Sequence, residues 1–110
     1  MKGVAKMIYQ IALLNGMRIH VNGEPLEIDT PVFKGFNFFV YQGIKTWIVC
    51  EVITGAKIAE GSTKYEAIGA AVTKLSANGR DILIEKINEF SQQYGRTTDG
   101  LSMNLPANAS

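Results

Sequence analysis

The first apolar segment of the chain has the spacing of a helix. Its apolar side chains recur every three or four positions, at Val4, Met7, Ile8, Ile11 and Leu14. Asn15-Gly16 then supplies a stop signal. We therefore predict an N-terminal helix over residues 4–14. A strand is the alternative, because residues 7–14 are rich in apolar side chains.

The next segment alternates apolar and polar positions, which is typical of strands. Residues 18–21 and 26–28 both alternate, and Asn22-Gly23 between them favours a tight turn. These features predict a β-hairpin. Pro25 has no backbone N–H, so we expect the second strand of this hairpin to lie at an edge of the sheet.

A three-stranded β-meander is predicted over residues 36–60. Its strands are residues 36–41, 44–53 and 56–60, separated by Gln42-Gly43 and Thr54-Gly55. The long middle strand is largely apolar on both faces, so both faces need a cover. We expect the following helices to cover one face. The cover of the other is the first hairpin and helix, or another molecule.

Two helices are predicted after the meander. Thr63 and Glu66 have the spacing of a capping box, and Asn78-Gly79 ends the apolar stripe that follows them. A further helix is expected over residues 81–93. Residues 96–110 show little periodicity, so the sequence predicts one α+β domain over 1–95 and a flexible tail over 96–110.

Charge and composition narrow the classes of function. The chain has 11 basic and 10 acidic residues, a net charge of +1, and one cysteine. A nucleic-acid binder usually carries a basic excess, and the lysines here are spread thinly. One thiol is compatible with a reducing compartment, and no apolar run is long enough to span a bilayer. We expect a cytoplasmic protein without membrane contact.

Reactive constellations are sparse in this sequence. His20 lies on the polar side of the predicted hairpin, and Cys50 lies on an apolar strand face. A catalytic dyad of Cys50 and His20 is the alternative, although their spacing does not indicate one. The acidic residues lack metal-ligand spacing, and the glycines form no phosphate-binding loop. We therefore expect no enzymatic activity, no cofactor and no metal.

Aromatic residues are concentrated around the meander. We select those that alternate across its two faces as candidate interface residues: Phe36, Phe38, Phe39, Tyr41 and Trp47. Filling a core is the first interpretation. Aromatic side chains on both faces exceed what one small core needs, so an interface with a partner is the second. Stacking on unpaired bases is the third.

The order strand-strand-strand-helix resembles the second half of a double-stranded-RNA-binding domain. The resemblance is carried by Glu60-Gly61-Ser62-Thr63-Lys64 and by Ala67, Ala70 and Ala71 in the helix. The Gly-Ser-Thr turn is also similar to that of small DNA-binding domains at integrase N-termini. The resemblance implies nucleic-acid binding, for which we expect Lys45, Lys64 and Arg80 to contact phosphate.

Our leading hypothesis from the sequence is a non-enzymatic protein–protein interaction module. Its partner would be another protein or a second copy of the chain, and we expect self-association. The small size and scarcity of motifs are typical of accessory or inhibitor proteins of bacteria and mobile elements. Nucleic-acid binding is the alternative hypothesis.

Overall fold

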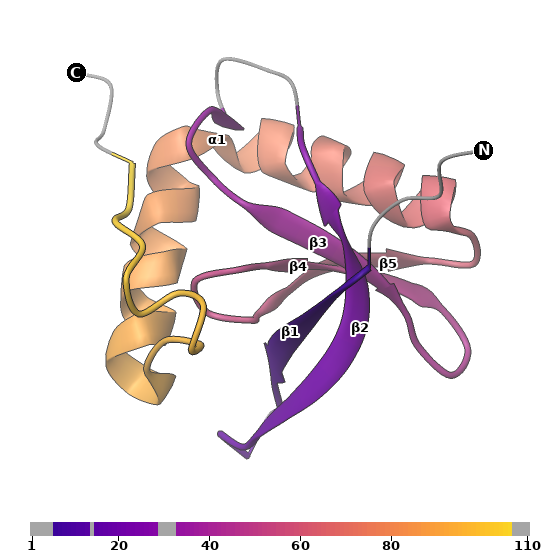
Figure 1. Cartoon of the computed structure of the whole chain (residues 1–110). Helices are drawn as coiled ribbons and strands as arrows, with labels where there is room; N and C mark the ends of the chain where they lie inside the picture. Colours follow the sequence, from indigo (N-terminus) through magenta and orange to yellow (C-terminus); the bar gives the residue numbers. More distant parts are fainter. Residues whose placement is uncertain (1–5, 14, 29–32, 107–110) are drawn as a thin grey trace.

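The computed structural model describes residues 6–13, 15–28 and 33–106 of the chain. Five strands are followed by one long helix (Figure 1). The elements are β1 (Met7–Ala12), β2 (Arg18–Leu26), β3 (Phe38–Gln42), β4 (Trp47–Glu51), β5 (Lys57–Gly61) and α1 (Lys64–Tyr94). The α+β class predicted from the sequence is confirmed. No helix within the described ranges is long and apolar enough to cross a membrane.

The strands form one antiparallel sheet in the order β1-β2-β3-β4-β5. The predicted N-terminal helix is wrong, because Met7–Ala12 is strand β1 and pairs with β2 from Met7↔Gly23 to Ala12↔Arg18. Tyr9 and Ile11 are buried, whereas Ile8 before them is exposed and Gln10 between them is half-buried. Burial thus follows the two-residue period of a strand, although both faces of β1 carry apolar side chains. Val4 and Leu14 of the predicted helix lie outside the described residues.

The predicted turn at Asn22-Gly23 is also wrong, because β2 runs through it without interruption. Gly23 pairs with Met7 on one side and Tyr41 on the other. The rings of Tyr9 and Phe39 stack across this position with centroids 4.2 Å apart. A Cβ atom on Gly23 would lie 3.0 Å from one ring and 3.1 Å from the other. The glycine therefore serves the close approach of two aromatic rings.

Pro25 does not lie on an edge strand, since β2 is flanked by β1 and β3. The described pairing of β1 ends at Gly23, however, and Pro25 is paired to Phe39 of β3. The proline thus stands where β2 has a described partner on one side only. On the side without a described partner, the missing backbone N–H of Pro25 therefore removes no hydrogen bond between strands.

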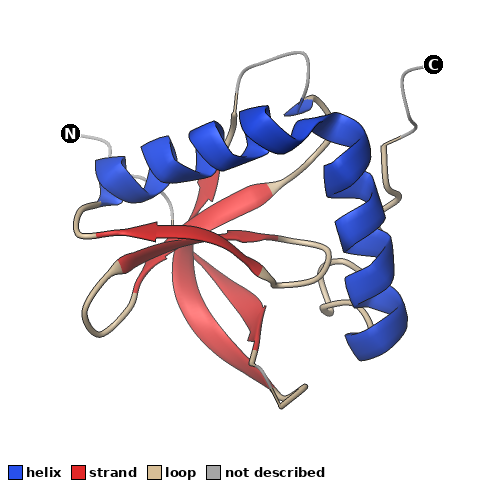
Figure 2. Ribbon diagram, turned by 180° about the vertical axis from the view of Figure 1, so that it is seen from behind, coloured by secondary structure: helices blue, strands red, loops and turns tan. Residues whose placement is uncertain are grey.

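The two predicted C-terminal helices are one 31-residue helix with a sharp bend (Figure 2). Gly79 has φ 81° and ψ 172°, which breaks the helical backbone without ending the element. We call residues 64–78 the first arm and residues 80–94 the second arm. The capping box is present: Thr63 Oγ1 accepts from the Glu66 N–H, and the Glu66 carboxylate accepts from the Ser62 N–H, both at 3.1 Å.

Both faces of the central strands are covered by the chain itself. Phe38 and Val40 of β3 point into a core shared with α1, and Phe39 between them points to the opposite side. On that side Phe39 and Cys50 form a cluster with Ile11 of β1. β1 is three strands away from β4 in the sheet order, so the sheet coils and brings the β1–β2 hairpin across its own face. The second face of the sheet is therefore covered by the chain itself.

The stretch 96–106, expected to be part of a flexible tail, lies along the second arm and the turn between β4 and β5 (Figure 1). Thr97 is buried; its N–H donates to the Ile53 carbonyl at 2.9 Å, and its hydroxyl donates to the Val52 carbonyl at 2.7 Å. Gly100 packs so closely on Ile53 that a Cβ atom would lie 2.4 Å from its carbonyl oxygen. These contacts join residues 96–106 to the domain core.

Candidate functional site

Three of the five predicted interface residues lie inside the protein. Phe36, Phe38 and Phe39 are buried in the two cores. Tyr41 and Trp47 are half-buried at the margins of the cores. In this fold a partner could reach only Tyr41 and Trp47 of the predicted set. The aromatic density of residues 36–47 is explained largely by a sheet that has a core on each side.

The structure separates the two candidate reactive residues. Cys50 pairs with Phe39 on the inner face of the coiled sheet, whereas His20 pairs with Gln10 on the outer face and is exposed. Burial, reinforced by the charge of Glu51, raises the pKa of Cys50 to about 12, so the thiol stays protonated at neutral pH. Within the described ranges, no group of three or more His, Cys, Asp and Glu side chains is placed to hold a metal ion.

The predicted phosphate-binding residues do not lie together. Lys64 Nζ is 2.8 Å from a carboxylate oxygen of Glu24. Arg80 donates to the Lys34 carbonyl at 2.9 Å and lies 4.9 Å above the centre of the Phe36 ring. Lys64 and Arg80 are separated by the whole first arm, about 24 Å at 1.5 Å per residue. Lys45 is exposed in the turn between β3 and β4.

The main concave feature is a groove of about 870 Å³ beside the bend of α1. Its walls are the end of β1 (residues 11–13), the β4–β5 turn (residues 54–58), the end of the first arm and one side of the second arm. We call it the elbow groove. No pattern in the sequence indicates this groove, because its walls come from segments that are far apart in the chain.

The floor of the elbow groove is apolar and uncharged. Leu75, Leu83 and Ile87 are buried there, and Ile82 remains 41% exposed to solvent. Tyr41 also lines the groove, and burial raises its pKa to about 12, so its phenol is neutral at physiological pH. An apolar surface of this kind is costly to leave in water and is typical of binding sites.

The upper end of the groove is formed by aromatic and aliphatic side chains from two elements. Phe90 and Tyr94 are half-buried on the second arm, with ring centroids 4.8 Å apart. Leu13 faces them from the end of β1 and is 37% exposed. Gly16 of the β1–β2 turn lies against the Tyr94 ring: a Cβ atom added to this glycine would be 3.5 Å from the ring. The apolar surface therefore continues from the groove to the hairpin tip.

Lysines predominate on the rim of the groove. Lys57, Lys74 and Lys86 line it from β5, the first arm and the second arm. All three are exposed, and Lys74 Nζ donates to the Ile58 carbonyl at 3.0 Å. Two carboxylates also line the groove: Glu89 is exposed, and Glu51 is buried and hydrogen-bonded within its turn. The accessible rim is thus net positive.

Glu51 builds the β4–β5 wall of the groove from inside. Its carboxylate accepts from the backbone N–H of Ile53, from the N–H of Thr54 at 2.9 Å and from the Thr54 hydroxyl at 2.7 Å. Burial raises the pKa of Glu51, while these hydrogen bonds and the charge of Arg96 act in the opposite direction. A buried carboxylate with three donors fixes the turn in one conformation.

Arg18 fixes the position of the second arm. Its guanidinium donates to the Thr54 carbonyl at 2.7 Å and to the Gly95 carbonyl at 2.8 Å, so it joins the β4–β5 turn to the end of α1. A cation is favourable at the C-terminus of a helix, where unpaired carbonyls carry partial negative charge. No local pattern indicates this role, because Arg18 has the position of any polar residue in an alternating strand.

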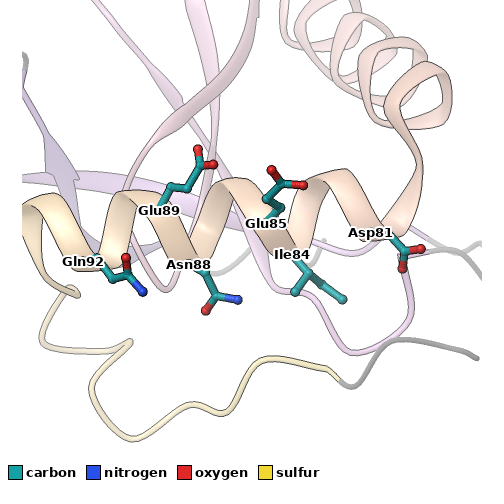
Figure 3. Close-up of a pocket in the computed structure, with 6 residues that line it drawn as sticks. All are labelled: Asp81, Ile84, Glu85, Asn88, Glu89 and Gln92. Atoms are coloured by element: carbon teal, nitrogen blue, oxygen red, sulfur yellow. The ribbon is translucent and has the colours of Figure 1, made fainter.

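A second, shallower hollow of about 360 Å³ lies on the outer side of the second arm. It is lined by side chains one helical turn apart, shown in Figure 3: Asp81, Ile84, Glu85, Asn88, Glu89 and Gln92. The three carboxylates are exposed, and Glu85 and Glu89 project from the same side of the helix. They form a solvated acidic flank.

We compared the chain with models of protein families, with curated protein sequences and with solved structures, and none matched. The elbow groove is therefore interpreted from its own chemistry.

Proposed function

We propose that this protein is a non-enzymatic protein–protein interaction module that binds its partner in the elbow groove. The observation that carries the proposal is the apolar floor with Ile82 exposed in it. The hot spots of protein interfaces are large side chains that enter such pockets and become fully desolvated. The groove is long enough along the second arm to take several side chains of a bound segment.

The walls of the groove support a preformed site. Arg18 ties the β4–β5 turn to the helix end, and Glu51 holds the backbone of that turn. A surface that is rigid before binding loses little conformational entropy when the partner arrives, so more of the contact energy contributes to affinity. Arg18 and Glu51 thus support a binding role as well as the fold.

Site-specific photocrosslinking tests the proposal. A benzophenone amino acid at Ile82 should give a discrete covalent adduct in cells of the source, identified by mass spectrometry. The matched control is Ile44, which is fully exposed in the β3–β4 turn outside the groove. No adduct at Ile82, or the same adducts at Ile82 and Ile44, would contradict a binding role for the groove.

Self-association is the simplest form of this function, with a second copy as the partner. An Ile82 adduct of twice the chain mass would identify it. Light scattering on the purified protein gives an independent measurement. A strict monomer at high concentration removes self-association and leaves a different protein as the partner.

Nucleic-acid binding is the second candidate, favoured by one observation. The groove lined by the three lysines is also lined by Phe90 and Tyr94, and such aromatic rings can stack on unpaired bases. Binding of a single-stranded oligonucleotide at low salt, with affinity that falls steeply as salt is added, would support it. No binding at low ionic strength would exclude it.

A further inference from the structure

We infer that the elbow groove takes an acidic amphipathic segment of its partner, in which carboxylates flank a stripe of apolar side chains. This inference rests on the proposed function and specifies the chemistry of the partner. It follows from the distribution of charge around an apolar floor.

The three lysines surround the groove. Lys57 stands on β5, Lys74 on the first arm and Lys86 on the second arm, so the positive charges come from three walls. A segment lying on the floor would have its flanks beside these ammonium groups. Glu89 is an exposed carboxylate that lines the same groove, and Glu60 lies beside Lys57, so a basic segment would meet three ammonium groups and two carboxylates.

The position of Lys74 is fixed by the protein. Its ammonium group donates to the Ile58 carbonyl of β5 and still has two N–H groups for a ligand. Lys57 lies 3.5 Å from Glu60 as an exposed pair, which a competing carboxylate can replace at little cost. Both ammonium groups are therefore available to carboxylates that arrive along the rim.

The floor favours side chains over nucleic-acid bases. Its most exposed apolar side chains are aliphatic, Ile82 on the second arm and Leu13 directly after β1, whereas Phe90 and Tyr94 are half-buried. Branched aliphatic surfaces pack well against leucine- or isoleucine-like groups, whereas bases stack on flat rings. The net charge of +1 also supplies no general attraction for a polyanion. The ligand that best fits the groove is therefore a peptide segment.

Three synthetic peptides test the inference against the full chain by fluorescence anisotropy. Each has 18 residues and the same leucine stripe at helical spacing, and its flanks are glutamate, glutamine or lysine. The glutamate peptide should bind about tenfold more tightly than the glutamine peptide, since three exposed ion pairs of ordinary strength give that ratio. The lysine peptide should bind most weakly.

Charge variants locate the effect. The triple variant Lys57→Glu, Lys74→Glu and Lys86→Glu should invert the order of the three peptides. A matched variant, Lys34→Glu with Lys45→Glu, changes exposed lysines outside the groove and should leave the order unchanged. The single variant Lys86→Gln guards against misfolding of the triple variant, and it should weaken the glutamate peptide about twofold to threefold.

Each result decides one point. Equal binding of all three peptides, abolished by Ile82→Asp, would overturn the inference on charge and still support the groove as a protein-binding site. Failure of the glutamate peptide to bind would overturn the inference, while the Ile82 crosslink would still decide the proposed function separately. Binding of a fifteen-nucleotide oligothymidine without binding of any peptide would overturn it in favour of nucleic acid.

Discussion

The two arms of α1 meet the same domain in different ways. The first arm buries two small side chains, Ala67 and Ala71, before Leu75 at its end, and its start comes very close to the sheet. A Cβ atom on Gly61 of β5 would lie only 2.5 Å from the Ala67 nitrogen. The second arm buries larger side chains, among them Leu83 and Ile87, and leaves Ile82 in the elbow groove.

The difference shows how one helix can both close a core and leave a binding surface. Small residues allow close backbone approach and leave no space at the start of the first arm, whereas its end already borders the groove. The end of the second arm is held by hydrogen bonds from Arg18, which fix a distance without filling the space beside it. Four substitutions should distinguish the tightly packed part of the helix from the part beside the groove.

Leu83→Ala should have the largest effect on stability. Leu83 is buried in the helix-covered core, and removing such a side chain leaves a cavity that costs about 3 kcal/mol. The measurement is the free energy of unfolding from denaturant titration. Ile82→Ala at the next position is the matched control, since Ile82 is 41% exposed, and it should cost less than about 1 kcal/mol. Equal losses would mean that Ile82 is as closely packed as the buried Leu83.

Ala71→Leu should destabilise the protein by about 2 kcal/mol, because the first arm has no space for three more carbon atoms. Ala70→Leu adds the same atoms at an exposed position of the same arm and should change stability by less than about 0.5 kcal/mol. Thermal unfolding of both variants gives the comparison. An Ala71→Leu protein as stable as the Ala70→Leu protein would show that the first arm is not tightly packed.

Arg18→Lys should cost about 1.5 kcal/mol, because a single ammonium group cannot reach both the Thr54 and the Gly95 carbonyls as the guanidinium does. Hydrogen exchange should accelerate selectively in the last turn of the second arm and in the β4–β5 turn. Amides of the first arm are the internal control. Uniform acceleration in both arms would contradict a local role for Arg18.

Glu51→Gln should change the pH dependence of stability and have the smallest effect. Burial raises the pKa of Glu51 above its ordinary value of 4.5, so the folded state favours the protonated carboxyl. The stability that this preference contributes is complete below pH 4.5 and is lost as the pH rises through the folded-state pKa. The wild type should therefore lose stability relative to Glu51→Gln as the pH rises above 4.5, by at most about 1.4 kcal/mol per pH unit.

Denaturant titrations of both proteins at several pH values measure this difference. The other titrating groups are common to the two proteins and cancel when their free energies of unfolding are subtracted. A difference that stays constant, or that moves in favour of the wild type as the pH rises, would mean that hydrogen bonds from Ile53 and Thr54 dominate over burial.

Local signals in the sequence predicted much of the second half of the fold. The capping box at Thr63 and the break at Gly79 depend on neighbours within a few residues, and both are present in the structure. The prediction for the N-terminal region was wrong because it, too, relied on local signals. Residues 7–12 carry apolar side chains on both faces, and pairing with β2 decides between helix and strand. Asn22-Gly23 likewise has the chemistry of a turn, but stacked rings from β1 and β3 use the glycine within a strand.

The α+β class, the antiparallel order of the last three strands and the place where α1 starts and bends could be predicted from the amino-acid sequence. These features depend on period, capping and backbone freedom, which act over short stretches of chain. The cover of the second face of the sheet and the position of the groove became visible only in the folded chain. Those outcomes depend on Ile11 meeting Cys50 and on Arg18 reaching Gly95, contacts between residues far apart in the chain that leave no local pattern.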